Sequence, residues 1–265
     1  MKIDYEYLFN DPNEKPLDRL VTDGGYSRIF RTIACVGDSL SSGEFESMNP
    51  DGSHGYYDMF EFSWGQFIAR TTGAKVYNFS RGGMSATPYL KDFAESMGYW
   101  DPEKAAQAYI IAMACNDLNP ATQREFGSIA DVDFDDWHKT NIDTYAGSYA
   151  CMIQRYKEIQ PRAKFFLLTM PKGAPDPVDD ATRQKQRALM YELAEKFDNT
   201  YVIDLYEYGP VYDEEFQEKF YMLGHLNPMG YAFTADIVMS YIDYIIRHNM
   251  EDFKQIGFIG TDLHP

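Results

Sequence analysis

Hydrophobic positions along the chain gather in five short apolar runs, with a helix-like spacing of apolar residues between them. Each run is between five and seven residues long and shows little alternation of apolar and polar positions. This pattern is typical of strands that are buried on both faces of a sheet. The predicted strands are residues 30–36, 75–79, 108–114, 164–170 and 201–205.

Five further stretches have the periodicity of helices. The predicted helices are residues 63–71, 88–97, 142–159, 181–197 and 228–247. The last has clear end signals, because Asn227 can cap it, Pro228 suits its first turn and Arg247 suits its carboxyl end. Strands that alternate with helices predict a three-layer α/β/α sandwich around a central, mostly parallel five-stranded sheet.

Two stretches lack such periodicity. Residues 43–62 are rich in aromatic residues and glycine, and residues 171–180 hold three prolines and three aspartates. We expect both to be irregular. The 265 residues are enough for one α/β domain with a sizeable core. We expect an N-terminal extension over residues 1–28 and a C-terminal tail over residues 250–265.

The charge balance narrows the choice of partners. The chain has 41 acidic and 24 basic side chains and a formal net charge of −17. A field of that sign repels phosphate backbones and anionic lipids, so nucleic acid and membrane partners are disfavoured, whereas a homo-oligomer is compatible with the sequence. The amino-terminal residues have no apolar stretch of a secretory signal, and no segment reaches the length of a membrane span. We therefore expect a cytoplasmic protein with its three cysteines reduced.

Candidate chemistry lies at the ends of the predicted strands. In parallel α/β sheets the reactive crevice lies outside the carboxyl ends of the strands. Ser39 follows the first strand, Gly83 follows the second and Asn116 follows the third, while His225 stands just before the last helix. A hydroxyl, a glycine amide, a side-chain amide and an imidazole are thus predicted to share one rim.

These are the groups that acyl transfer requires. A serine hydroxyl is a poor nucleophile unless a base takes its proton, and a histidine is suited to that role near neutral pH. The negative oxygen of the tetrahedral intermediate then needs preorganised donors. We expect Ser39 to be the nucleophile and His225 the base. The backbone amides of Ser39 and Gly83 and the side-chain amide of Asn116 are the expected donors.

The four blocks together resemble the SGNH (GDSL-type) hydrolase family. "GDSLSSG" holds Ser39, "NFSRGG" places Gly83 five residues after an asparagine, "ND" begins at Asn116, and "HLNPMG" begins at His225. The resemblance spans residues 33 to about 247. It implies a flavodoxin-like α/β/α fold, a small-molecule ester as substrate, and no cofactor.

The chain departs from the family pattern at two positions. Ala114 stands where the family usually has glycine, a small change. The family's aspartate three residues before the histidine is replaced by Met222. We expect a Ser-His dyad that leans on a main-chain oxygen, as in some carbohydrate esterases that resemble this family. The alternatives are loss of activity or another carboxylate, for which the candidates are Asp204, Asp213, Glu214, Glu215 and Glu218.

The expected function is a serine esterase that removes a short acyl group, acetyl above all, from a carbohydrate or similar small substrate. An acyltransferase that uses the same acyl-enzyme is one alternative, and a disabled relative that only holds a glycan is another. The G-x-S-x-G elbow of α/β-hydrolases fits less well, because its fifth position is Ser41.

Overall fold

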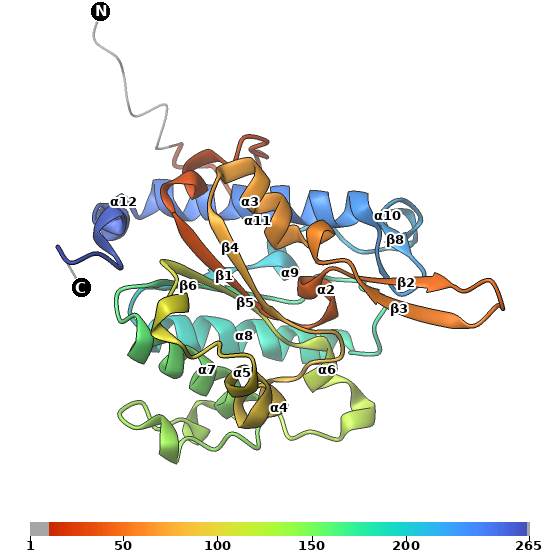
Figure 1. Ribbon diagram of the computed structural model, residues 1–265, viewed down its shortest axis with the longest axis horizontal. Coiled ribbons are helices and arrows are strands. Elements are labelled where there is room, and N and C mark those ends of the chain that lie inside the picture. The colour runs from red at the N-terminus through yellow and green to blue at the C-terminus, as the bar shows by residue number, and fades with distance from the viewer. Residues whose placement is uncertain (1–10, 264–265) are drawn as a thin grey trace, which may run out of the picture.

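A five-stranded parallel sheet forms the centre of the computed structural model, which describes residues 11–263 (Figure 1). The strands are β1 (Thr32–Gly37), β4 (Lys75–Ser80), β5 (Ala108–Ala112), β6 (Lys164–Leu168) and β7 (Thr200–Ile203). They lie in the order β4-β1-β5-β6-β7, and all neighbours are parallel. All five predicted strands are present, and the expected fold class is confirmed.

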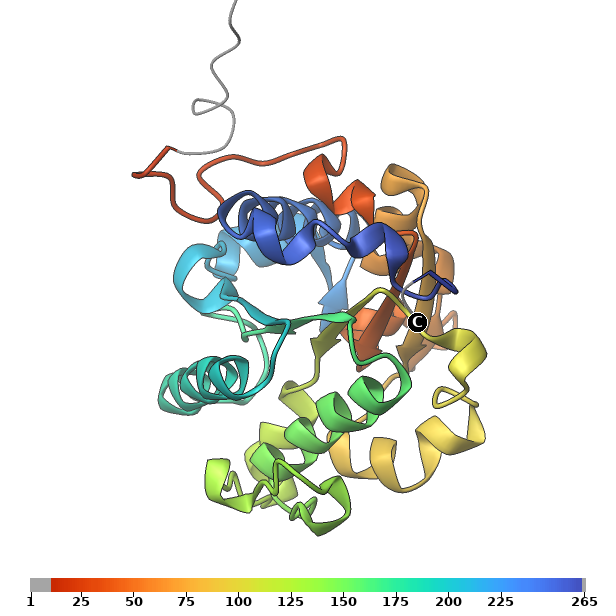
Figure 2. The same ribbon diagram turned by 90° about the vertical axis from the view of Figure 1, so that its left-hand side faces the viewer.

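Helices cover both faces of this sheet. The longer ones are α3 (Trp64–Thr72), α7 (Tyr145–Ile159), α8 (Asp180–Lys196) and α11 (Pro228–His248). Successive side chains of a strand point to opposite faces, so Ile33 and Cys35 pack with α3 and α11 while Ala34 and Val36 pack with α7. Figure 2 shows α11 on one side of the sheet and α7 and α8 on the other. Two cores therefore hold the sheet in place.

The ends of the long helices follow the sequence signals. Asn227 caps α11, because its side-chain oxygen accepts a hydrogen bond from the Gly230 amide at 2.9 Å, and Pro228 occupies the first turn as expected. The predicted helix over residues 88–97 is present but uneven, since a π-helical turn, Tyr89–Phe93, separates two short α-helical turns. Among the described residues, the remaining α-helices are α2 (Ser39–Ser42), α4 (Ala86–Pro88), α5 (Ala94–Ser96), α6 (Cys115–Leu118), α9 (Leu205–Tyr208), α10 (Glu214–Phe220) and α12 (Met250–Phe253), and several short 3-10 turns lie between these elements.

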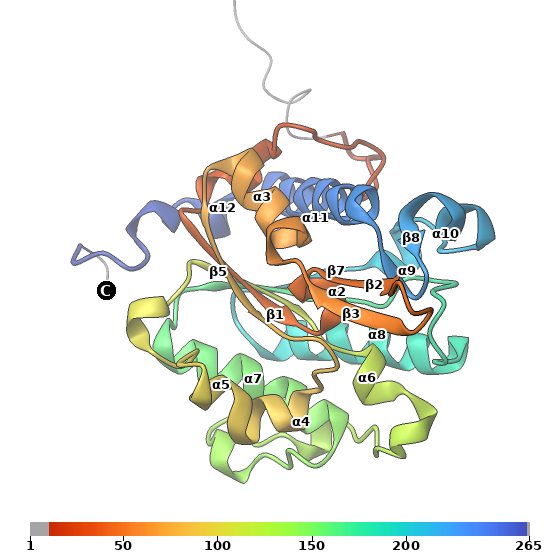
Figure 3. The same cartoon turned by 45° about the vertical axis from the view of Figure 1, so that its right-hand side comes forward.

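The expectation of an irregular segment over residues 43–62 is wrong. Strands β2 (Glu44–Met48) and β3 (His54–Asp58) form an antiparallel hairpin that projects beyond the sheet in Figure 1 and lies in front of it in Figure 3. A second small hairpin, β8 (Tyr221–Met222) and β9 (His225–Leu226), lies against β2. By contrast, residues 171–180 are irregular until α8 begins, as expected.

The strand order places a crevice between β1 and β5. After β1 the chain turns to α3 on one face, and after β5 it continues to α7 on the other face. Such a switch point is where open α/β sheets bind ligands. The segments that follow these two strands contain Ser39 and Asn116.

The ends of the chain are only partly described. Residues 1–10 of the expected N-terminal extension and residues 264–265 of the expected tail lie outside the described residues. Nearer the domain, Glu14 pairs with Arg247 of α11, and Phe253 is buried in the core. Within residues 11–263, no helix combines the length and the apolar character needed to cross a membrane.

Candidate active site

The turn after β1 holds Ser39 in a buried position. Asp38 caps the short helix α2, since its carboxylate accepts a hydrogen bond from the Leu40 amide at 3.1 Å. Ser39 is the first residue of α2 and is 7% exposed. Gly43 ends the helix with a left-handed φ of 85°, which glycine adopts without strain. The hairpin β2–β3 therefore begins directly behind the turn that holds Ser39.

Asn116 lies against the loop that contains Gly83. Its side-chain nitrogen donates a hydrogen bond to the Met84 carbonyl at 3.1 Å. An amide NH₂ has two donors, so one remains for a ligand. Gly83 has a left-handed φ of 69°, and the space where its side chain would stand is open. The structure thus brings these two predicted donor residues together.

A buried ion pair holds this loop from behind. The Asp117 carboxylate accepts a hydrogen bond from the Ala86 amide at 3.0 Å and pairs with Arg124. The guanidinium also donates to the Ser148 hydroxyl at 2.6 Å. Burial lowers the pKa of Arg124 from its usual value. Because Asp117 directly follows Asn116, this network holds the backbone of the segment that carries Asn116.

His225 lies on β9, which packs against α2. In the part of the chain that the structure describes, no hydrogen bond joins its ring to the Ser39 hydroxyl. The two ring nitrogens instead face two carboxylates of β2. Nδ1 lies 3.3 Å from Glu46 Oε2, and Nε2 lies 3.4 Å from Glu44 Oε1. The Tyr56 ring and the imidazole also make a T-shaped contact, with the ring centres 5.8 Å apart.

Glu46 accepts from three donors. The Gly224 amide donates at 2.8 Å, His54 Nδ1 lies at 2.9 Å from Oε1, and His225 Nδ1 lies at 3.3 Å. Burial by itself would raise the pKa of Glu46, but the hydrogen bonds from Gly224, His54 and His225 outweigh it and lower the pKa. Since an ionised carboxylate can only accept, His225 Nδ1 is the protonated nitrogen in this arrangement.

The pKa of Glu44 is shifted in the opposite direction from that of Glu46. Burial raises its pKa above the usual glutamate value, although the nearby His225 opposes the shift. Its carboxylate also lies against Gly82, where a side chain would collide with it. Glu44 therefore lies between His225 Nε2 and the loop that contains Gly82 and Gly83.

The prediction that a main-chain oxygen orients His225 is wrong. The group at Nδ1 is a carboxylate and not a main-chain oxygen, and it comes from none of the candidate residues. Asp204 pairs with Arg187, Asp213 caps α10, and Glu215 pairs with Lys219. Glu214 and Glu218 are exposed on α10. Sequence reasoning missed Glu46, although the alternation in "GEFES" places Glu44 and Glu46 on one side of an extended segment close behind Ser39.

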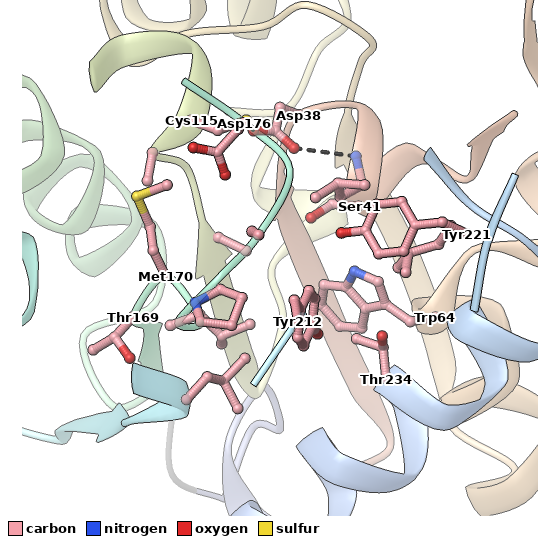
Figure 4. A pocket seen from close by; sticks show the side chains of 18 residues that line it. Asp38, Ser41, Trp64, Cys115, Thr169, Met170, Asp176, Tyr212, Tyr221 and Thr234 are labelled. Atoms are coloured by element: carbon pink, nitrogen blue, oxygen red, sulfur yellow. Dashed lines mark hydrogen bonds between the residues drawn. The ribbon is translucent and has the colours of Figure 1, made fainter. Parts of the chain in front are cut away.

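A mainly apolar pocket opens beside the turn that holds Ser39 (Figure 4). Its volume is about 100 Å³. Residues on both sides of Ser39, namely Asp38 and Leu40, contribute to the lining. Trp64 and Tyr221 form part of the wall opposite Met170. The pocket therefore lies within the crevice at the carboxyl ends of the strands.

The fold and the four converging blocks define an α/β/α hydrolase of the SGNH type. The chain belongs to the GDSL-like Lipase/Acylhydrolase family, whose model matches residues 35–233. It is thus an enzyme that hydrolyses ester bonds. A comparison with curated proteins found no match.

Solved structures with the same fold include several esterases. A family two carbohydrate esterase from Clostridium thermocellum, solved in complex with cellohexaose, is 15% identical, with a TM-score of 0.56 over 90% of this chain and 66% of its own. The lipase/acylhydrolase from Enterococcus faecalis is 19% identical, with a TM-score of 0.53, and the match covers 80% of this chain and 95% of that protein. The acetyl xylan esterase AlAXEase is 18% identical, with a TM-score of 0.51, and the match covers 80% of this chain and 99% of that protein.

Proposed function

We propose that this enzyme hydrolyses carboxylic esters through an acyl-enzyme on Ser39. The observation that carries the proposal is the convergence of separate segments on one rim. Ser39 follows β1, the Asn116 amide contacts the loop of Gly83, and β9 brings His225 against α2. A nucleophile, a base and oxyanion donors are the minimum for acyl transfer to a serine.

The reaction proceeds in two halves. Ser39 Oγ attacks the ester carbonyl carbon while His225 Nε2 takes the hydroxyl proton. The amides of Ser39, Gly83 and Asn116 donate to the oxyanion, and His225 then returns the proton to the departing alcohol. In the second half a water molecule gives its proton to His225 and attacks the acyl carbon, which releases the carboxylic acid and restores Ser39.

We propose a short acyl group, with acetyl preferred, as the part of the substrate that Ser39 receives. The pocket beside Leu40 is mainly apolar, and its 100 Å³ are far below the roughly 300–1,000 Å³ of pockets for drug-sized ligands. A carbohydrate or similar polyol is the proposed alcohol. Two of the similar structures are a carbohydrate esterase and an acetyl xylan esterase, and the exposed Tyr56 beside His225 offers a surface on which a sugar ring can stack.

A panel of p-nitrophenyl esters from acetate to octanoate tests the proposal. Wild-type protein is expected to favour the shortest esters, and Ser39→Ala and His225→Ala are expected to lower kcat by on the order of 1,000-fold or more. Equal rates in the three proteins would overturn the esterase mechanism. A preference for octanoate would overturn only the short acyl group.

Covalent labelling identifies the nucleophile directly. A fluorophosphonate probe is expected to mark the peptide that contains Ser39 in the wild type and to leave Ser39→Ala unmarked. The neighbouring hydroxyl Ser42 serves as the matched control, because it is buried in the same helix and hydrogen-bonds to Asp58. A label on Ser42, or on any other residue in the Ser39→Ala protein, contradicts the assignment.

A further inference from the structure

We propose that Glu46 is the positioning residue for His225, in place of the aspartate that Met222 replaces. The inference rests on the proposed function, since it assigns a role in the same reaction. It concerns a residue of the β2–β3 hairpin, which lies 179 positions before His225 in the sequence. The acid would thus reach the histidine from the segment that follows the nucleophile.

Met222 cannot supply this function. It pairs with His225 across the β8–β9 hairpin, and its side chain is neutral and 37% exposed. Glu46 approaches the histidine from β2, which packs against both β8 and β9. The 3.3 Å between His225 Nδ1 and Glu46 Oε2 is the contact that a positioning acid requires.

The carboxylate of Glu46 is itself held in place. The Gly224 amide and His225 Nδ1 both meet Oε2, while His54 Nδ1 meets Oε1 at 2.9 Å. Gly224 leaves the necessary room, because an added side-chain carbon would stand 2.6 Å from Oε2. Donors on both oxygens fix the plane of the carboxylate, so its direction toward His225 does not depend on a single contact.

This arrangement selects the useful tautomer of the histidine. With Nδ1–H donating to Glu46, Nε2 carries the lone pair that accepts the proton of Ser39 in the proposed reaction. In the structure Nε2 faces Glu44 Oε1 at 3.4 Å, so this transfer requires the ring to turn from Glu44 toward Ser39. The negative charge of Glu46 then stabilises the imidazolium that forms. A main-chain oxygen at the same place would orient the ring but would not supply the charge.

Kinetics with p-nitrophenyl acetate test the role. Glu46→Ala removes both the acceptor and the charge, and we expect kcat to fall by about 100- to 10,000-fold while KM stays within about threefold. Glu46→Gln keeps an oxygen for Gly224 and Nδ1 and loses the charge, so we expect an intermediate loss. Glu61→Gln, an exposed glutamate just beyond the hairpin, is the matched control and should match the wild type.

The tautomer of His225 gives a second readout that needs no turnover. Nitrogen-15 spectra, assigned with His225→Ala, should show the Nδ1–H form in the wild type and in Glu46→Gln, and a loss of that preference in Glu46→Ala. If kcat falls while the tautomer is unchanged in Glu46→Ala, Glu46 only supports the fold and the inference is wrong. It is also wrong if Glu46→Ala keeps kcat within threefold of the wild type.

The two proposals fail in different ways. If the wild type turns over no ester, the proposed function fails, and the spectra alone then decide whether Glu46 positions the ring. If the wild type is active and Ser39→Ala is not, but Glu46→Ala behaves as the wild type, only the inference fails. Thermal unfolding of each variant shows whether a loss of activity comes from a loss of fold.

Discussion

The thiol of Cys115 donates a hydrogen bond to the buried carboxylate of Asp38, with 3.1 Å between Sγ and Oδ2. Burial raises the pKa of both groups, and the Asp38 charge raises that of the thiol further. The two residues are neighbours of Asn116 and Ser39, so the contact ties together two segments of the candidate active site. It also keeps the thiol protonated.

The first prediction follows from that protonation. Because the thiolate is the reactive form, Cys115 in the native protein should react with iodoacetamide at pH 8 far more slowly than an exposed cysteine. Cys35 and Cys151 are also free, and burial raises the pKa of each. Mass spectrometry should therefore find all three unmodified until the protein is unfolded. Rapid alkylation of Cys115 that removes the esterase activity would instead point to a thiol mechanism.

A second prediction concerns Gly224. Gly224→Ala places a carbon 2.6 Å from Glu46 Oε2 without changing any group that ionises. The displaced carboxylate should lower kcat by about tenfold or more, because a misplacement near 1 Å can cost about 100-fold. Gly257→Ala is the control, since nothing lies within 4 Å of its added carbon. Equal kcat values for the two variants would show that the position of Glu46 does not matter.

The third prediction concerns pH. Burial raises the pKa of Glu44, so this carboxylate, 3.4 Å from His225 Nε2, takes up a proton at a higher pH than an exposed glutamate does. Glu44→Gln removes this titrating group, so the step that Glu44 adds to the acidic limb of the kcat/KM profile should disappear. Glu46, His54, Tyr56 and Asp38 also face this cluster and are unchanged in the variant. An acidic limb of the same shape in the variant and the wild type contradicts the assigned effect of Glu44.

The buried pair behind Asn116 gives a prediction on stability. Asp117→Ala leaves the Arg124 guanidinium buried without its carboxylate and should lower the free energy of unfolding by about 3–5 kcal/mol. Asp143→Ala breaks an exposed pair with Lys91 and should cost about 1 kcal/mol or less. Urea unfolding of the two variants measures the difference. Similar losses would mean that the Asp117 pair is no stronger than a surface contact.

A fifth prediction tests the acyl pocket. Ala174 lines the pocket from the segment between β6 and α8. Ala174→Leu should fill part of the 100 Å³, so the rate on butyrate should fall by about tenfold relative to the rate on acetate. Kinetics with the two p-nitrophenyl esters give this ratio. A ratio equal to that of the wild type would place the acyl group elsewhere.

The sequence allowed prediction of the sheet, and of where Ser39 and Asn116 lie relative to its strands, because these signals are local. A strand buried on both faces is a continuous apolar run, so β1 and β5 stand out without knowledge of their neighbours. Ser39 and Asn116 follow those strands directly, and parallel order brings the ends of adjacent strands to one edge. The positions of these residues therefore follow from the order of strands.

The hairpin and the role of Glu46 had no comparable signal. Strand β2 contains two glutamates and a serine and is only partly buried, so its apolar pattern is weak. Contact between Glu46 and His225 depends on how β2 packs against β8 and β9, which are far away in the sequence. Only the three-dimensional arrangement shows which carboxylate reaches Nδ1.

Gly43 is the single residue between α2 and β2, so the proposed nucleophile and its proposed positioning acid share one short segment. Ser39 and Glu46 lie seven positions apart on one continuous stretch, and the β8–β9 hairpin needs to provide only the histidine and a glycine. An exchange of residues 37–62 between relatives would therefore move the proposed nucleophile and its proposed positioning acid together. In a chain built this way position 222 needs no carboxylate, so Met222 can be exchanged without loss of the acid.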